Sequence, residues 1–546
     1  MSPRSLARIL IGYVLGLALV CALVRHAFAL REVDGAAIWS GWRGGELVGR
    51  VAEGGALPRA PGMTLTQEQV VAEGALWTVF EPVFAVSVVA GRDGVKATLG
   101  DRTAYVTPDD LLARQAYDHG LTLSSLSLSL GVDVPLVEAL LAERLGTTVP
   151  ELRAKATFRR FRTNRVVGYP PQPYGDTKPE QVTPELLRGA AIDLAKFLAR
   201  GVGADGRFRY MIDAPTNRTI PGYDWPRHAG ATYFLAQAAG ITADPRIRDA
   251  ALLTGAYLRD HATLDCGAFR CVGAGDMVDL GSSSLAVIAM SEIAMHLDPS
   301  FRAPVEELTR FIRAQERPDG EFMHQYDRRA KRPIDTQGLY YSGEATLALT
   351  RAFTLTGDPA DLDGAKRGLA HLVGPAWSFF GDRYYFGEEH WTCQAMGDLW
   401  DSAGKARSAN PDALDFCRRW RAYDAKMMYG PGESPFDADG AFGVGPVVTP
   451  RLTPVASRTE ASVATLRAMI DANLDPAARE ALTAQTRRSF ALLIRQQLRP
   501  GESHLFADPG AVYGGMPGSP VDWQLRIDFA QHAGSAMIRA AELWSK

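Results

Sequence analysis

The sequence predicts a mainly α-helical protein, an (α/α)6 toroid preceded by a small α+β domain and an apolar N-terminal segment. Three observations lead to this prediction: an internal repeat beyond residue 184, mixed helix and strand patterns from 64 to 165, and an apolar run at the start of the chain. The length of 546 residues allows several domains. With 22% charged residues and a net charge of −3, the chain lacks the basic surface that binds phosphate backbones, so nucleic acid is not an expected partner.

Residues 1–30 have the layout of a signal peptide or a membrane anchor. Arg4 and Arg8 precede an apolar run, residues 9–24, and the small-x-small triplet Ala27-Phe28-Ala29 follows it. Cleavage near Ala29 would release a secreted protein. The run is also close to the ~17 residues of a spanning helix, which would leave the chain anchored in the inner membrane. Both alternatives place the rest of the chain in the periplasm or outside the cell.

Four of the five cysteines lie beyond this apolar run, and an even number in an exported chain predicts disulfides. Cys266 and Cys271 bracket a short turn and are expected to pair, which leaves Cys393 with Cys417. Zinc is the competing interpretation, but no CxxC or HxxxH spacing supports it. No metal and no cofactor are therefore predicted.

The chain between the apolar run and residue 184 is predicted to hold two linkers and one small domain. The Gly-rich residues 31–63 are expected to be a linker, and the Pro-rich residues 166–183 a stiffer one. Residues 64–165 are expected to form the α+β domain. Its predicted helices cover 66–80, 108–117 and 133–145, and its predicted strands cover 83–89, 95–99 and 103–106.

Residues 184–546 repeat one unit: an amphipathic helix, a turn with Gly and an aromatic residue, a loop, and a second helix rich in small residues. The turn recurs at 204–208, 266–269, 318–322, 380–384, 438–442 and, most weakly, 501–506. The second helices carry little charge beyond their first turn, so they are expected to be buried inside a ring of amphipathic helices. They are predicted to begin near Trp225, Leu280, Tyr341, Trp391, Glu460 and Gln531. An open stack of helical hairpins is the alternative, but such arrays have no fixed repeat number.

Polar side chains gather where these inner helices begin, and in a toroid those ends surround one mouth of the barrel. Candidate catalytic residues are Glu344, Asp224, Glu389, His390 and His532. Candidate substrate-binding residues are Arg227, His228, Asp279, Tyr340, Tyr341, Trp391, Gln394, Arg458, Glu460 and Gln531. Helix capping would account for Asp279 and Ser282, but not for the histidines or Arg458.

Aromatic rings beside carboxylates and guanidinium groups suit sugars, although the same rings would also fill space between helices. The chain has no Gly-rich phosphate cradle and no GxSxG esterase motif. Glu344 is followed by small and apolar residues, so burial is expected to raise its pKa into the general-acid range. The alternative is a first-turn acid that favours the helix dipole or pairs with Arg227 or Arg458.

As architecture, residues 184–546 resemble the six-hairpin carbohydrate enzymes, which include the N-acylglucosamine epimerase family, unsaturated glucuronyl hydrolases, related glycosidases and polysaccharide lyases. In the epimerases, histidines on the fourth and sixth inner helices form the acid/base pair. The matching positions are His390 in Gly-Glu-Glu-His-Trp and His532 in Phe-Ala-Gln-His-Ala-Gly. In the hydrolases a carboxylate pair acts, and Glu344 with Asp224 or Glu389 is the expected pair.

The sequence thus predicts an exported or anchored enzyme whose partner is an envelope or extracellular polysaccharide or oligosaccharide. A glycoside hydrolase is the first expectation. A sugar epimerase and a polysaccharide lyase are the alternatives among enzymes, and a non-catalytic glycan-binding toroid is the alternative of another class. The sequence leaves protein partners unknown.

Overall fold

The computed structural model describes residues 29–52, 57–117, 121–123, 126–128, 131–167, 176–374, 389–402, 410–434, 437–443 and 449–545. The chain divides into two compact units. The first comprises Met1–Pro170, Pro446–Thr449 and Gly501–Ala507, and the second comprises Pro171–Gly445, Pro450–Pro500 and Asp508–Lys546. Most of the expected signal or anchor, residues 1–28, lies outside the described residues. Within the described ranges, no helix has the length and apolar character needed to cross a membrane.

The first unit is built on one antiparallel sheet with its helices around it. The strand order is β3 (Glu46–Ala52), β2 (Ala37–Arg43), β4 (Thr64–Ala75), β9 (Thr157–Val167), β5 (Asp93–Leu99), β6 (Arg102–Val106), and β1 (Arg31–Glu32) also pairs with β4. The helices are α2 (Glu81–Ser87), α3 (Pro108–Ala113), α4 (Val134–Leu145) and α5 (Val149–Lys155), and β7 (Leu121–Leu123) and β8 (Leu126–Leu128) form a separate hairpin. Buried Ile38, Val70, Tyr105 and Phe161 form a core cluster of this unit.

Several local predictions for this unit are wrong. The linker expected at 31–63 contributes β1, β2 and β3 to the sheet, the expected helix at 66–80 is β4, and the expected strand at 83–89 is α2. Strand β4 pairs with β2 on one side and β9 on the other, so hydrogen bonds to distant strands outweigh its local helical pattern. Strand β9 overlaps the start of the expected linker at 166–183. Elements β5, β6, α3 and α4 confirm the remaining predictions in substance.

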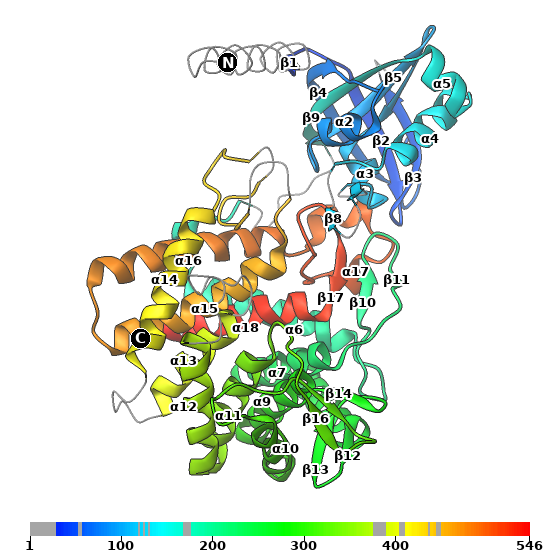
Figure 1. Cartoon of the computed structure of the whole chain (residues 1–546). Helices are drawn as coiled ribbons and strands as arrows, with labels where there is room; N and C mark the ends of the chain where they lie inside the picture. Colours follow the sequence, from blue (N-terminus) through cyan, green and yellow to red (C-terminus); the bar gives the residue numbers. More distant parts are fainter. Residues whose placement is uncertain are drawn as a thin grey trace, which may run out of the picture. The chain divides into compact units, whose positions relative to one another are not determined.

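The second unit is a closed (α/α)6 toroid, as predicted (Figure 1). In its described part, the inner helices are α7 (Trp225–Ile241), α9 (Leu280–His296), α11 (Tyr341–Thr356), α13 (Glu389–Ser402), α15 (Leu452–Asp471) and α18 (Ile527–Trp544). The outer helices are α6 (Pro184–Arg200), α8 (Pro245–Tyr257), α10 (Arg302–Gln315), α12 (Pro359–Val373), α14 (Pro411–Met427) and α16 (Pro476–Gln496). Each inner helix contacts the next, and α18 contacts α7. The ring therefore closes, which excludes an open stack.

The predicted starts of the first three inner helices are confirmed, and the fourth helix begins two residues earlier than predicted. Helix α15 begins at Leu452 rather than near Glu460, and α18 at Ile527 rather than near Gln531. Pro454 lies in the first turn of α15, where a proline is tolerated because that turn's N–H groups have no partner inside the helix. Because proline and charged residues are untypical of a buried helix, the pattern predicted starts for these two helices that were too late in the chain.

The repeated Gly turn has a steric reason in three of the repeats. Gly206, Gly320 and Gly440 have φ of 87°, 86° and 93°, a region that favours glycine. In each case a Cβ atom would also come within 2.5 Å of a backbone carbonyl oxygen of the next outer helix. These oxygens belong to Leu253 in α8, Arg367 in α12 and Arg488 in α16. The glycines thus let each turn pack directly against the following helix.

Both predicted disulfides are present. Cys266–Cys271 joins the adjacent strands β12 (Thr263–Cys266) and β13 (Phe269–Val272), and Cys393–Cys417 joins α13 to α14. The second bond links an inner helix to an outer one on the side of the ring where the candidate histidine His390 lies.

Candidate active site

A cavity of about 530 Å³ lies at the N-terminal ends of the inner helices, the mouth that the sequence predicted to be polar. All six inner helices contribute to its wall. Ten of the predicted site residues line it: Asp224, Arg227, Tyr340, Tyr341, Glu344, His390, Trp391, Arg458, Gln531 and His532. The repeat therefore brings together residues that lie more than 300 positions apart in the sequence.

Glu344, in the first turn of α11, is the acidic group best suited to hold a proton in this cavity. Its side chain is buried, and Oε2 has no hydrogen-bond partner among the described residues. Gly281 on α9 makes room for it, since a Cβ there would lie 2.4 Å from Glu344 Oε2. Burial raises the pKa of Glu344 well above its ordinary value, and the nearby carboxylates of Asp279 and Asp224 raise it further. Both effects favour the protonated form of this carboxyl group.

Asp224 is the more accessible carboxylate of the same wall. It caps α7 by accepting the backbone N–H of Arg227 at 3.2 Å, and its Oδ2 lies 2.6 Å from the Arg227 guanidinium. Arg227 also contacts Asp528 at 3.3 Å. Since the Asp224 side chain is 35% exposed, its carboxylate is both ion-paired and open to solvent or a ligand.

A second cluster of polar side chains, from α13, α15 and α18, lies at and behind the cavity wall. The ring centroids of His390 and His532 lie 5.5 Å apart, and His532 Nδ1 lies 2.7 Å from Glu460 Oε2. Trp391 packs against both imidazoles, with ring centroids 4.6 and 5.7 Å away. One potential ligating atom of each of His390, Glu460 and His532 lies within 4.8 Å of the others. Glu460 therefore orients His532 from behind rather than lining the cavity.

Besides Glu460, three predicted binding residues lie outside the cavity wall. His228 is fully buried, its Nδ1 2.6 Å from the Tyr223 hydroxyl and its Nε2 3.1 Å from the Thr254 carbonyl oxygen. The carbonyl can only accept, so Nε2 carries a proton, and burial lowers the pKa of His228 to about 4. His228 therefore bonds inside the helix packing and does not line the cavity.

Asp279 caps α9, accepting from the Ser282 N–H at 2.7 Å and the Ser282 hydroxyl at 2.9 Å, so the capping alternative is confirmed. Gln394 is fully buried behind the wall. The side chain of Glu389 lies outside the described residues.

The sequence analysis missed a segment of the wall at the start of α15. Arg451, Pro454 and Ser457 line the cavity beside Arg458, and Arg451 pairs with Asp522 from the loop before β17 (Gln524–Arg526). These residues were passed over because the fifth inner helix was expected to begin near Glu460. The loop before α18 provides Asp522, as the corresponding loop before α7 provides Asp224. The repeat could therefore have predicted a wall residue in the loop before α18.

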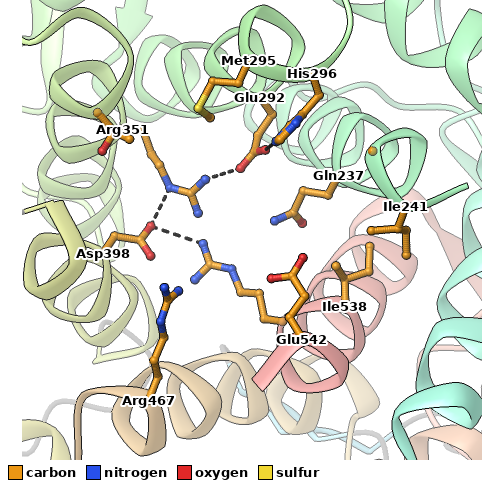
Figure 2. A pocket seen from close by; sticks show the side chains of 13 residues that line it. Gln237, Ile241, Glu292, Met295, His296, Arg351, Asp398, Arg467, Ile538 and Glu542 are labelled. Carbon is orange, nitrogen blue, oxygen red and sulfur yellow. Dashed lines mark hydrogen bonds and ion pairs between the residues drawn. The ribbon is translucent and has the colours of Figure 1, made fainter. Parts of the chain in front are cut away.

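The opposite mouth of the barrel holds a second cavity of about 360 Å³, lined by the C-terminal parts of the same six helices (Figure 2). A chain of ion pairs crosses it. His296 Nε2 lies 3.3 Å from Glu292, Glu292 pairs with Arg351, and Asp398 lies 2.5 Å from Arg351 and 3.3 Å from Arg539. Helix C-termini carry partial negative charge, which favours the arginines and the histidine here. The charged side chains of this ion-pair chain are therefore each paired with a group of opposite charge.

Comparisons with known proteins establish the fold of the second unit. Neither a protein-family model nor a curated protein sequence matches the chain. Among the similar solved structures is a D-mannose isomerase, with a TM-score of 0.50 and 14% sequence identity over 68% of this chain and 100% of that one. A sugar epimerase from a ruminal bacterium has a TM-score of 0.50 and 12% identity over 66% of this chain and 98% of that one. Cellobiose 2-epimerase from Bacillus thermoamylovorans B4167 has a TM-score of 0.51 and 10% identity over 66% of this chain and 99% of that one. The second unit thus has the six-hairpin toroid fold that the sequence resembles.

Proposed function

We propose that the protein is a carbohydrate-active enzyme that hydrolyses a glycosidic bond in a polysaccharide or oligosaccharide. The observation that carries this proposal is the pairing, in one cavity, of a buried carboxyl group that favours its protonated form, Glu344, with an accessible ion-paired carboxylate, Asp224. Glycoside hydrolysis needs one carboxyl group of each kind.

In the proposed reaction, Glu344 donates its proton to the glycosidic oxygen as the bond to the anomeric carbon breaks. Asp224 accepts a proton from the water molecule that attacks that carbon, and the product gains a new reducing end. Arg227 holds Asp224 in place through the 2.6 Å contact.

The remainder of the wall suits a sugar. Tyr340, Tyr341 and Trp391 line the cavity with aromatic rings that suit the C–H groups of a pyranose ring, and the partly exposed Arg227 offers hydrogen-bond donors to its hydroxyls. The names of the similar solved structures, D-mannose isomerase and cellobiose 2-epimerase, support a sugar substrate.

Epimerisation is the second candidate, favoured by the two imidazoles whose centroids lie 5.5 Å apart. One imidazole would remove a proton from a sugar carbon and the other would return one, with Glu460 orienting His532.

We also propose that the protein acts outside the cytoplasm, either secreted or anchored through residues 9–24. Two observations support this: the apolar run between arginines at the N-terminus and the two disulfides, which persist in oxidising compartments. The substrate class would then be an envelope or extracellular glycan.

The test is incubation with a panel of glycans in D₂O. Hydrolysis produces new reducing ends without carbon-bound deuterium, whereas deuterium in uncleaved sugar would reject hydrolysis in favour of epimerisation. Asp224→Asn should lower turnover by at least about 10²-fold while the cap is kept, because Asn also caps helices. Asp244→Asn, the same change at the cap of the outer helix α8, should leave turnover unchanged. Binding of glycans without turnover would favour the glycan-binding alternative.

A further inference from the structure

We propose that His390, Glu460 and His532 bind one divalent transition-metal ion at the wall of the cavity. The three side chains come from three adjacent inner helices, α13, α15 and α18, and each offers a ligating atom within 4.8 Å of the other two. All three are buried, with exposed fractions of 5%, 0% and 9%. Residues with no common spacing in the sequence thus form one compact set of donors.

The donor set selects the chemical class of the ion. Two imidazoles and one carboxylate are typical ligands of Zn²⁺, Co²⁺, Mn²⁺ and Fe²⁺, whereas Ca²⁺ and Mg²⁺ prefer oxygen donors alone. Two ligands of one zinc ion lie at most about 4 Å apart, since each bond is about 2.0–2.2 Å long. Side-chain movements on the order of 1 Å would bring the three donor atoms to coordination distance from one ion.

The contact between His532 Nδ1 and Glu460 Oε2, at 2.7 Å, shows that two donors already face each other. A metal ion would take the place of the hydrogen bond between them. The buried Glu460 carboxylate would gain a cation in surroundings where a charge without a partner is costly.

The open coordination positions would face the cavity, because His390 and His532 both line it while Glu460 lies behind them. Such positions would accept a water molecule or neighbouring hydroxyls of a sugar. A metal-bound imidazole nitrogen cannot accept a proton from carbon, so a metal at this site would argue against the epimerase mechanism. Glu344 lies on α11, and the metal proposal does not rest on the hydrolase proposal.

The test is metal binding by the full-length, disulfide-bonded chain, with no sugar present. After treatment with a chelator, equilibrium dialysis against Zn²⁺ should show one tightly bound ion per chain, and Co²⁺ should give visible absorption bands. His390→Gln, His532→Gln and Glu460→Gln should each weaken binding by at least about 10-fold. His261→Ala, which removes an exposed histidine, should bind as the parent does.

Thermal melting gives an independent readout that does not depend on turnover. Saturating Zn²⁺ should raise the melting temperature of the parent and of His261→Ala, and should leave that of Glu460→Gln unchanged. The proposal would be overturned if the parent has no tight site for Zn²⁺, Co²⁺ or Mn²⁺. It would also be overturned if the three site variants bind Zn²⁺ as tightly as the parent does. Since turnover is not measured, failure here leaves the hydrolase proposal standing.

Discussion

The two mouths of the barrel are formed by the same six inner helices and similar side chains, yet they shift the pKa of a buried glutamate in opposite directions. Glu344 at the N-terminal mouth and Glu292 at the C-terminal mouth are both 4% exposed. Burial and neighbouring carboxylates raise the pKa of Glu344. Burial also acts to raise the pKa of Glu292, but Arg351 and His296 outweigh it and the pKa is lowered. Charge matching, rather than depth of burial, therefore separates a structural glutamate from one available for chemistry.

The largest expected effect is on stability at the C-terminal mouth. Glu292→Gln removes one of the two carboxylates that pair with the buried Arg351 guanidinium and leaves Asp398, so it should lower the free energy of unfolding by about 3 kcal/mol. Urea unfolding at neutral pH measures this change. Turnover per folded molecule should stay at the parental level. An unchanged unfolding free energy would mean that the ion-pair chain does not stabilise the barrel.

The matched change at the other mouth should affect turnover instead. Glu344→Gln replaces a protonated carboxyl group by an amide of the same shape, so the melting temperature should not fall below that of the parent. Turnover of the glycan should fall by about 10²-fold or more, because the amide cannot donate the proton. Steady-state kinetics and thermal melting check both parts. A variant that melts well below the parent, or that keeps full activity, would contradict the assignment of Glu344 as the acid.

The pH dependence of stability should differ in sign between the two glutamates. The pKa of Glu344 is raised in the folded protein above about 4.3, its value in the unfolded chain, so stability should fall as pH rises above that value toward the folded pKa. The slope is at most about 1.4 kcal/mol per pH unit, and Glu344→Gln should remove it. Glu292, with its lowered pKa, contributes stability that is lost as pH falls below about 4.3. Urea unfolding of the parent and both variants from pH 3 to 8 checks these signs, and identical slopes in all three would refute them.

The smallest expected effect concerns the helix cap near Glu344. Asp279→Ala removes the bond to the Ser282 N–H and should cost about 1 kcal/mol. Asp279→Asn should cost much less, because an amide oxygen also accepts this bond. Thermal melting of the two variants measures the difference. Equal losses would mean that the charge of Asp279, rather than its cap, is what the fold requires.

The repeat pattern explains how much of the site could be predicted. Alternation of buried and amphipathic helices placed Glu344, Asp224, His390 and His532 at one mouth, because all inner helices of a toroid begin at the same end. His228 obeyed the same rule but faces Tyr223 and Thr254, since its rotation about the helix axis depends on packing. The ion pairs at the opposite mouth could not be predicted, because Glu292, Arg351 and Asp398 lie on three different helices and no spacing in the sequence relates them.

The sequence by itself determined the toroid, the Gly turns and the two disulfides, because these depend on local hydrophobic periodicity, backbone conformation and cysteine number. Only the tertiary structure decided that residues 37–52 are strands, since their hydrogen-bond partners include β4, outside that segment. It also decided which polar residues face the cavity and which carboxylates lack a neutralising cation. Both depend on the distances between side chains of different helices, which a linear pattern does not contain.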